Sequence, residues 1–405
     1  MKKLEPHIER ELRRGVIDII PKDDFFGALA SGRKLRLKLG LDPSKPDLHI
    51  GHGVLLRKLR LLQEMGHQVV LIVGDWTAQI GDPSGQSVMR PMLTAEEVRA
   101  NAETYMRQFF YVVDKAKTEV RWQSEWFDKF SLADTVRLAS RFTVAQMLQR
   151  EDFRTRYETQ KPLGVHELFY PLLQAYDSVV IESDVEFGGT DQLFNLLVGR
   201  ELQEEMGQRP QACITMRLLV GTDGTQKMSK SLGNTIDFED PPSEKYGKVM
   251  SIADSALIDY LELATDVPDE ELAYIRKHLD ERSINPMETK KRLGREIVTQ
   301  FHGEAAALEA EAAWVRVFSG KEQPTDALPL MLQSAADAAT FNLVDLLVEH
   351  GLAVSKARAR ELIRQGGVEI NARKILLDEA RSVELQEGNI IRVGRSTFRR
   401  VSIEQ

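Results

Sequence analysis

An alternating apolar segment near the start of the chain leads directly into a helical pattern. Residues 35–42, Leu-Arg-Leu-Lys-Leu-Gly-Leu-Asp, place their leucines on one face, which is typical of a β-strand. Residues 52–64 repeat leucine at helical spacing, and residues 69–73 are all apolar and predict a second strand. A strand, a helix and a buried strand in this order predict two parallel strands joined by a crossover helix.

The same alternation continues through the first half of the chain. Residues 178–187 and 212–220 are apolar runs that predict further strands, while residues 95–110 and 191–206 have helical spacing. Nearly continuous apolar strands separated by helices predict an α/β domain whose parallel sheet is covered on both faces. Such sheets bind ligands at the carboxyl ends of their strands, so polar residues there are candidates for a site.

Later residues follow a different pattern. Residues 241–318 are rich in Glu, Ala, Leu and Lys and predict helices alone, whereas residues 319–339 contain Gly320, Pro324 and Pro329 and resemble a linker. A chain of 405 residues is long enough to bury more than one core. We therefore expect a parallel-sheet domain over 1–235, an all-helical domain over 236–325, a linker over 326–340 and a small α+β domain over 341–405.

Charge is unevenly distributed along the chain. The net charge is −8, but residues 341–405 carry 11 Lys and Arg against 9 Asp and Glu, so +2 here leaves −10 for the rest. A basic end on an acidic body fits a protein that holds RNA locally, and chance unevenness explains it almost as well.

The single cysteine, Cys213, excludes an intramolecular disulfide. Short apolar runs and a charged start predict a cytoplasmic protein without membrane association.

The first motif that carries chemistry is His49-Ile50-Gly51-His52, after the first strand. His49 and His52 are three residues apart and share one face of a helix, and Gly51 removes a side chain where a nucleotide can approach. A helix N-terminus attracts phosphate, and imidazole donors there can stabilise charge that develops on a reacting phosphate. On their own, two histidines at this spacing are more often a surface feature or a metal-like pair than a nucleotide site.

The second motif is Lys-Met-Ser-Lys-Ser at residues 227–231, within the glycine-rich stretch 221–233. Lys227 and Lys230 in such a loop suggest a basic segment that closes over a triphosphate and neutralises charge as pyrophosphate leaves. Taken alone, a lysine pair indicates only a solvated turn.

Together the two motifs resemble, letter for letter and in the same order, the H-I-G-H and K-M-S-K-S signatures of the class I aminoacyl-tRNA synthetases. Residues 81–85 (GDPSG), 170–177 (YPLLQAYD) and 188–192 (GGTDQ) are similar to the tyrosyl branch of that class. The resemblance extends over essentially the whole chain. It implies an enzyme that activates L-tyrosine with ATP, supplied as its Mg²⁺ complex, and transfers the tyrosyl group to the 3′ end of tRNA(Tyr).

The same resemblance implies a homodimer without a tightly held metal, a Rossmann-like catalytic domain and a helical anticodon-binding domain. The residues implied for the transition state are His49, His52, Lys227 and Lys230. Those implied for tyrosine are Asp82, Tyr170 and Gln174 at its ammonium group, Asp177 at its phenol hydroxyl and Gln192 along the pocket. Those implied for ATP and the adenylate are Asp42, Gly51, Asp191, Arg90 and Lys230.

Taken one at a time, these residues have plainer interpretations. Asp177 can be a turn residue or a helix N-cap, Tyr170 can belong to the core, and Asp82 can start a turn. Gln174 and Gln192 can be ordinary surface amides. Only their combination on one scaffold makes the site specific.

Lys38 departs from the commonest pattern of the family, in which many relatives have a tyrosine that shares the phenol hydroxyl. By alternation Lys38 points to the same face as Gly40 and Asp42, so we expect it near the pocket. Its stem can pack on a ring while its ammonium group reaches a carboxylate. The sequence leaves open which second group holds the phenol.

The last domain begins with a basic helix. Ser355 is a candidate N-cap for a helix over 356–365. Lys356, Arg360 and Arg364 are spaced by four and form one basic stripe. The domain resembles the S4-type RNA-binding domain, which implies contacts between this stripe and tRNA phosphates. A solvated amphipathic helix is the plainer alternative.

Three other functions stay open from the sequence. The tryptophanyl branch shares the fold and both signatures, although residues 174–177 and 189–192 favour tyrosine. A non-catalytic RNA-binding protein on the same scaffold is disfavoured by the intact histidine and lysine motifs. A related nucleotidyltransferase would leave the last domain unexplained.

Overall fold

The structure, a computed structural model, describes residues 5–44, 47–84, 92–320, 327–333, 338–394 and 397–404. The chain divides into two compact units, Met1–Leu218 and Leu219–Gln405. This division precedes residue 235, where the sequence pattern places the end of the first domain, so residues 227–231 lie in the second unit. Along the described residues, no helix has the length and apolar character needed to cross a membrane.

The first unit contains a six-stranded sheet in the order β1-β6-β5-β2-β3-β4. The neighbours from β6 to β4 are parallel, and β1 pairs antiparallel with β6 at the edge. The strand bounds are Val16–Ile20 for β1, Arg36–Leu41 for β2, Gln68–Val73 for β3, Thr118–Trp122 for β4, Val185–Gly189 for β5 and Ala212–Met216 for β6. The predicted α/β class with a mainly parallel sheet is confirmed.

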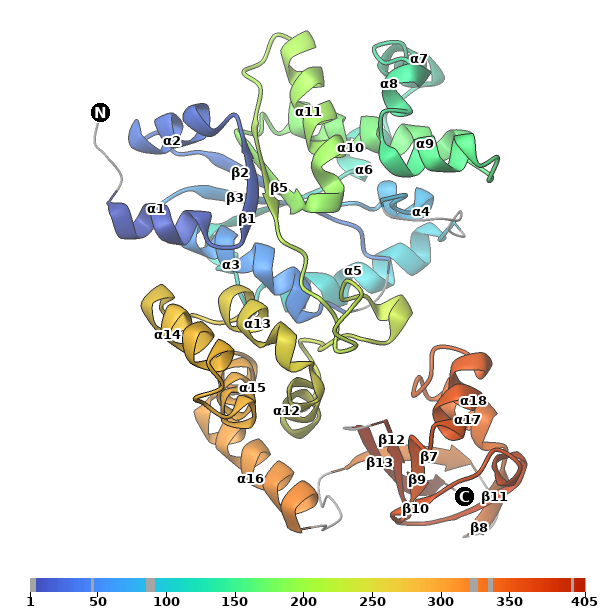
Figure 1. The fold of residues 1–405 in the computed structure, drawn as a ribbon. Helices are drawn as coiled ribbons and strands as arrows, with labels where there is room; N and C mark the ends of the chain where they lie inside the picture. Colours follow the sequence, from blue (N-terminus) through green and yellow to red (C-terminus); the bar gives the residue numbers. More distant parts are fainter. Residues whose placement is uncertain are drawn as a thin grey trace. The chain divides into compact units, whose positions relative to one another are not determined.

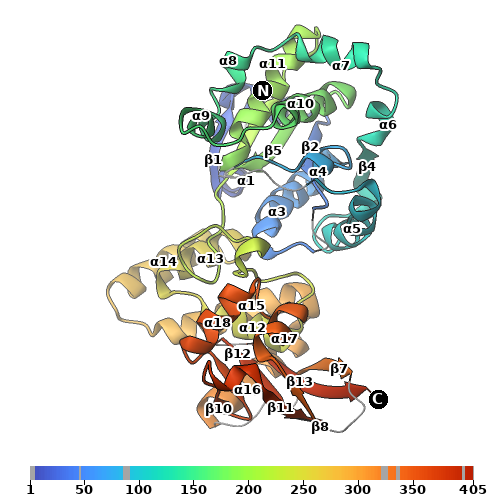
Figure 2. The same ribbon diagram turned by 90° about the vertical axis from the view of Figure 1, so that its right-hand side faces the viewer.

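Helices cover both faces of this sheet (Figures 1 and 2). Helices α3 and α5 lie on one face, and α10 and α11 lie on the other. Their bounds are Ile50–Glu64 for α3, Ala95–Phe109 for α5, Tyr170–Val180 for α10 and Leu193–Glu205 for α11. Leu172 and Leu173 of α10 and Leu202 of α11 pack with Val70 and Ile72 of β3 in one buried cluster. Burial of this cluster fixes the start of α10 relative to the central strands.

Most predicted elements of this unit are confirmed, but the strand predicted over 178–187 was wrong over residues 178–184. Residues 178–180 are the last residues of α10, and β5 begins only at Val185. A short apolar run has no period that separates a buried helix end from a buried strand. The prediction also missed β1 and β4, which are short and carry charged residues among the apolar ones.

After the loop that carries residues 227–231, the second unit continues with helices packed on one another. Their bounds are Pro242–Ser251 for α12, Leu257–Ala264 for α13, Asp269–Asp280 for α14, Pro286–His302 for α15 and Glu304–Gly320 for α16. Tyr246 and Met250 of α12 share a buried cluster with Val298 of α15 and Ala310 of α16. The helical character predicted for residues 241–318 is therefore confirmed.

The end of the chain forms a five-stranded sheet, β10-β9-β12-β13-β7, and a two-stranded sheet, β11-β8, together with two helices. The bounds are Leu328–Gln333 for β7, Ala338–Phe341 for β8, Leu343–Glu349 for α17, Lys356–Arg364 for α18, Val368–Ile370 for β9, Arg373–Lys374 for β10, Val383–Gln386 for β11, Ile390–Val393 for β12 and Thr397–Glu404 for β13. Strand β7 and most of β8 thus occupy residues expected to be a linker. Pro329 is compatible with β7 because, among the strands that the structure describes, β7 is an edge strand that pairs with β13.

Candidate active site

The candidate site lies where the strand order reverses. Strands β2 and β5 are neighbours, but the chain continues from β2 to β3 and β4 on one side and from β5 to β6 on the other. Ligands of open α/β sheets bind at this point, outside the carboxyl ends of the strands. Asp42 directly follows β2, and residues 190–192 directly follow β5. Candidates that are far apart in the sequence therefore meet at one edge of the sheet.

His49 and His52 lie at the start of α3. His49 is the N-cap residue and is buried, and the centroids of the two imidazole rings are 3.9 Å apart. The backbone N–H of His49 donates to Nδ1 of His52 at 3.2 Å. Because Nδ1 accepts this hydrogen bond, the neutral His52 ring carries its proton on Nε2. The ring can thus offer an N–H donor at a helix N-terminus, where anions are stabilised.

Asp42, directly after β2, is hydrogen-bonded to residues of two helices. Its Oδ1 accepts from the hydroxyl of Thr77 at 2.7 Å, and its Oδ2 accepts from the hydroxyl of Tyr170 at 2.9 Å. Gly74 passes so close that a Cβ there would collide with Oδ1 of Asp42 and with the Thr77 hydroxyl. Only glycine allows this approach of the end of β3 to the end of β2.

Asp82, Gln192 and Gln174 are joined through hydrogen-bonded amides. Nε2 of Gln192 donates to Oδ2 of Asp82 at 2.7 Å. Nδ2 of Asn195, the third residue of α11, donates to Oε1 of Gln192 and to Oε1 of Gln174, each at 3.0 Å. Gly188 lies so near that an added Cβ would come within 2.7 Å of Cβ of Gln192. The structure therefore brings together residues that the resemblance assigns to one substrate.

Arg150 is a buried cation beside this group, and the sequence analysis did not identify it. Its guanidinium donates to Oδ1 of Asn195 at 3.1 Å and to the hydroxyl of Ser84 at 2.6 Å, and it pairs with Asp152 at 2.8 Å. One Arg150 nitrogen also lies 3.8 Å from Oδ1 of Asp82. These contacts fix the turn that carries Asp82 and Ser84 against the first turn of α11.

Asp177 lies inside α10 and has only 1% of its surface exposed, so it is neither a turn residue nor an N-cap. Nε2 of Gln123 donates to its Oδ2 at 2.8 Å, and Nε1 of Trp126 donates to its Oδ1 at 3.2 Å. Burial raises the pKa of Asp177 to about 7, although the positive charge of Lys38 opposes this rise. Each carboxylate oxygen keeps a further lone pair, so the group can accept one more hydrogen bond.

Lys38 is fully buried, and the expectation that its ammonium group reaches a carboxylate is confirmed. The carboxylate belongs to Glu186, whose Oε1 lies 2.9 Å from Nζ of Lys38. Nζ also donates to the backbone carbonyl of Gln174 at 2.6 Å and to the hydroxyl of Ser178 at 2.7 Å.

Lys227 and Lys230 belong to a loop of the second unit. Lys227 forms an isolated antiparallel bridge with Val220, and Nζ of Lys230 lies 3.5 Å from Oδ2 of Asp237. The side chain of Asn234 closes the loop by accepting from the backbone N–H of Ser229 at 2.8 Å. The loop is therefore a folded turn whose second lysine faces a carboxylate of its own unit.

The remaining predicted residues lie in several parts of the chain. Arg90 falls outside the described residues. Asp191 is half-buried after β5, and an added Cβ on Gly189 would come within 2.7 Å of its Oδ1. The basic helix over 356–365 is confirmed as α18, with the hydroxyl of Ser355 accepting from the N–H of Arg358. Lys356, Arg360 and Arg364 are all exposed on it, and Lys356 pairs with Asp345 at 2.7 Å.

Sequence reasoning missed the residues that support the site, namely Thr77, Gln123, Trp126, Arg150, Glu186 and Asn195. No spacing signal marks them, because each acts through a contact with a distant residue. Within the ranges that the structure describes, no group of three or more His, Cys, Asp or Glu is arranged to hold a metal ion.

Comparison with known proteins finds two matching families. Residues 30–319 match the family of class I tRNA synthetases for tryptophan and tyrosine (W and Y). Residues 323–392 match the SYY-like C-terminal domain of tyrosine–tRNA ligases. The tyrosine–tRNA ligase of Dehalococcoides mccartyi is 55% identical over 398 residues, 98% of this chain and 99% of the relative. That of Thermotoga maritima is 51% identical over 391 residues, 96% of each chain.

Solved structures share the fold. A C-terminally truncated mitochondrial tyrosyl-tRNA synthetase of Aspergillus nidulans superposes with a TM-score of 0.64 at 20% identity, over 78% of this chain and 95% of that one. The tyrosyl-tRNA synthetase of Archaeoglobus fulgidus, complexed with L-tyrosine, gives 0.59 at 21% identity, over 75% and 99%. Because the match to the class I family spans most of the chain, and the relatives are more than half identical over nearly their full length, the chain belongs to the tyrosine–tRNA ligases, a family of class I aminoacyl-tRNA synthetases.

Proposed function

We propose that the edge of the sheet formed by the ends of β2, β3 and β5 activates L-tyrosine. The tyrosine carboxylate attacks the α-phosphate of ATP, which forms the tyrosyl-adenylate and releases pyrophosphate. A hydroxyl of the terminal adenosine of tRNA(Tyr) then attacks the carbonyl carbon, and AMP leaves. Neither step needs a nucleophilic side chain, so the protein contributes orientation and charge stabilisation.

One observation carries this proposal: two different kinds of hydrogen-bond acceptor are held at two places along α10. Near its start, the hydroxyl of Tyr170 and the amide oxygen of Gln174 lie in a hydrogen-bonded set with Asp42, Asn195 and, through Gln192, Asp82. These groups suit an ammonium group, which can only donate. Further along, the carboxylate of Asp177 is oriented by two donors and suits a phenol hydroxyl.

For the nucleotide, we assign His49, His52 and Gly51 to the phosphates and Asp191 to the ribose. Support comes from the position of both histidines in the first turn of α3 and from the proton that His52 carries on Nε2. We assign Asp42, whose carboxylate accepts hydrogen bonds from Thr77 and Tyr170, to a place between the two substrates. The imidazole N–H donors at the start of α3 would stabilise charge on the phosphate during adenylate formation.

The basic loop completes the proposed mechanism. We assign Lys227 and Lys230, together with Arg90, to the departing pyrophosphate, and we keep 1–235 as the catalytic domain for this reason. Magnesium enters as part of the ATP substrate, where it neutralises phosphate charge. The helical segment over 236–325 and the domain over 341–405 would bind the tRNA, the latter through Lys356, Arg360 and Arg364.

A homodimer in the cytoplasm is part of the same proposal. Support for the dimer comes from large apolar side chains that are exposed near α7 (Leu132–Ala139) and α8 (Val144–Met147). Leu132 is 81% exposed, Val136 59% and Val144 63%. Apolar side chains gathered in this way mark a surface for a protein partner, and a second copy is the partner that the family implies.

ATP–pyrophosphate exchange with tyrosine, tryptophan or phenylalanine, each supplied alone, tests the function. We expect exchange with tyrosine only. Exchange with tryptophan would favour the neighbouring branch, and RNA binding without any exchange would favour a non-catalytic scaffold. Exchange that needs no amino acid would indicate a different nucleotidyltransferase.

A further inference from the structure

Lys38 and Glu186 form a fully buried ion pair that takes part in none of the proposed substrate contacts. The two residues are register partners on the adjacent parallel strands β2 and β5, and each has 0% of its surface exposed. Burial of two charges carries a desolvation cost that apolar side chains at these positions would avoid. The sheet itself therefore gives no energetic reason for the pair.

The hydrogen-bonding capacity of Lys38 is fully used inside the protein. An ammonium group has three donors, and those of Lys38 are directed to the carbonyl of Gln174, the hydroxyl of Ser178 and the carboxylate of Glu186. Lys38 consequently has no donor left for a substrate. It is not the second partner of the phenol hydroxyl, the role that many relatives give to a tyrosine at this position.

The carboxylate of Glu186 is surrounded by donors. Its Oε1 accepts from Nζ of Lys38 and from Nε2 of Gln174 at 3.0 Å, and its Oε2 accepts from the hydroxyl of Ser178 at 3.1 Å and from Nε2 of Gln211. An ionised carboxylate can only accept hydrogen bonds. The amide of Gln174 must therefore present its nitrogen, and not its oxygen, to Glu186.

This requirement sets the opposite end of the same amide. With Nε2 facing Glu186, Oε1 of Gln174 faces Asn195, which donates to it at 3.0 Å. Asn195 also donates to Gln192, which in turn donates to Asp82. Oε1 of Gln174 thus lies on the side of the acidic and carbonyl acceptors.

We propose that Lys38 and Glu186 are a positioning pair that fixes the amide of Gln174 with its oxygen toward the substrate ammonium group. In the reverse orientation, the NH₂ group of Gln174 would face the ammonium donors and the hydrogen bond would be lost. Lys38 supplies the opposite charge that compensates the carboxylate of Glu186 away from solvent. This inference rests on the proposed role of Gln174 in binding tyrosine.

The double variant K38M/E186Q tests the pair while leaving no unpaired buried charge. The new amide at position 186 can offer either an oxygen or a nitrogen to Gln174, so the orientation of the Gln174 amide is no longer imposed. In ATP–pyrophosphate exchange, we expect the KM for tyrosine to rise about tenfold, as for the loss of one hydrogen bond to a charged group. The KM for ATP and the kcat should stay within about twofold. An unchanged KM for tyrosine in this folded variant would overturn the proposal.

A rescue variant separates positioning from general support of the fold. In K38M/E186Q/Q174E, the NH₂ group of the new amide at position 186 donates to one oxygen of the new carboxylate at position 174. The other oxygen of that carboxylate is an acceptor in any orientation. The KM for tyrosine should therefore return toward the wild-type value. A purely structural role predicts no rescue, and failure of rescue in a folded triple variant would contradict the proposal.

The control variant R36M/E119Q removes another ion pair of β2. Arg36 lies two residues before Lys38 and pairs with Glu119 at 3.0 Å. Loss of this ion pair should leave the KM for tyrosine unchanged.

E186D is a second test that does not depend on the folding of K38M/E186Q. It keeps the charge but withdraws the carboxylate from Gln174, so it should raise the KM for tyrosine several-fold. No rise in E186D would contradict the proposal. A wild-type chain without tyrosine-dependent exchange would instead refute the proposed function.

Discussion

The hydroxyl of Tyr170 donates a hydrogen bond to Oδ2 of Asp42 across 2.9 Å. This contact joins the first residue of α10 to the residue that follows β2. Burial, with the negative charges of Asp42 and Asp82, raises the pKa of the Tyr170 phenol well above its usual value, so the hydroxyl keeps its proton. Because the hydroxyl uses this proton in its hydrogen bond to Asp42, the lone pairs of the Tyr170 oxygen can accept a hydrogen bond from a ligand.

Y170F should weaken tyrosine binding. The variant keeps the ring and its packing but removes the acceptor oxygen, and a hydrogen bond to a charged group contributes about 1.5–3 kcal/mol. We expect kcat/KM for tyrosine in the exchange reaction to fall by about 10- to 100-fold, with little change in the KM for ATP. Y157F is a matched control, because Tyr157 is 65% exposed on α9 (Glu151–Glu158). Equal losses in both variants would remove Tyr170 from the site.

D177N should become more stable relative to wild type as the pH rises. The folded-state pKa of Asp177, about 7, lies above its ordinary value of 3.8, so the fold favours the protonated form. The stability from this group is fully present below about pH 4 and is lost as the pH rises through 7. The asparagine introduced by D177N stays neutral throughout, so the melting temperature of D177N relative to wild type should rise between pH 5 and pH 8.5. A difference that does not change with pH would contradict the raised pKa.

Tyrosine activation by the wild-type chain should depend on the same ionisation. The ionised carboxylate of Asp177 accepts from the phenol hydroxyl more strongly than the neutral acid does. Lys38 favours this ionised form and Glu186 opposes it. We therefore expect kcat/KM for tyrosine to fall as the pH drops below about 7. In D177N this quantity should be lower at pH 8 and should vary less between pH 6 and 8, as followed by pyrophosphate exchange.

The fold could be predicted from the sequence wherever a periodic pattern coincided with burial. The alternation at 35–42 and the leucine spacing at 52–64 became β2 and α3 because one face of each packs into the core. At 178–187 the same reasoning failed, since a helix end and a buried strand are equally apolar. Strand β7 was missed because Pro329 indicates a loop. Only the pairing of β7 with β13, far along the chain, shows that Pro329 stands in an edge strand.

The candidate site divides in the same way. Residues such as His49 and Asp177 stand in motifs that can be recognised along the chain. Gln123 and Glu186 do not stand in such motifs. The role of Gln123 depends on a contact with a residue 54 positions away, and the role of Glu186 depends on its partner on the neighbouring strand. Even Lys38, whose direction followed from alternation, needed the position of Glu186 before its ammonium group could be assigned to the interior.

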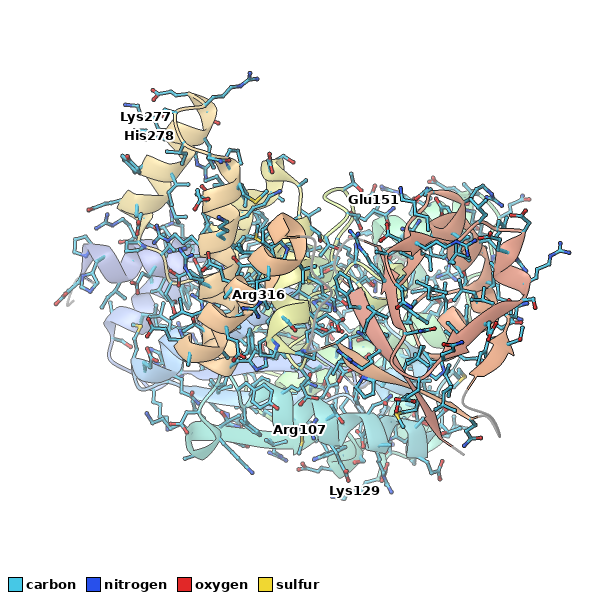
Figure 3. All side chains as sticks on the ribbon, turned by 90° about the horizontal axis from the view of Figure 1, so that it is seen from below. Arg107, Lys129, Glu151, Lys277, His278 and Arg316 are labelled. Atoms are coloured by element: carbon cyan, nitrogen blue, oxygen red, sulfur yellow. The ribbon has the colours of Figure 1, made fainter. Side chains whose placement is uncertain are left out.

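K230A should slow adenylate formation with little effect on tyrosine affinity. Lys230 is proposed to meet charge that develops only as pyrophosphate leaves, so its loss affects the transition state more than the bound amino acid. We expect the exchange rate to fall by about 100-fold, as for the loss of one charge-stabilising donor. K277A is the control, since Lys277 lies in α14, at the surface (Figure 3). Its side chain is 68% exposed. Equilibrium binding of tyrosine that weakened as much as the rate would argue against the assigned role.

The triple variant K356A/R360A/R364A should lose tRNA affinity without losing amino acid activation. These exposed side chains lie on α18, whose apolar residues Ala359 and Ile363 are buried, so their removal leaves the packing of the helix intact. If each contacts one phosphate, the slope of log Kd against log salt should become shallower by up to about 3. Lys356 already pairs with Asp345, so its share should be the smallest. Filter binding of tRNA(Tyr) at several salt concentrations, beside pyrophosphate exchange, measures both quantities. An unchanged salt slope with normal exchange would show that tRNA is held by another surface.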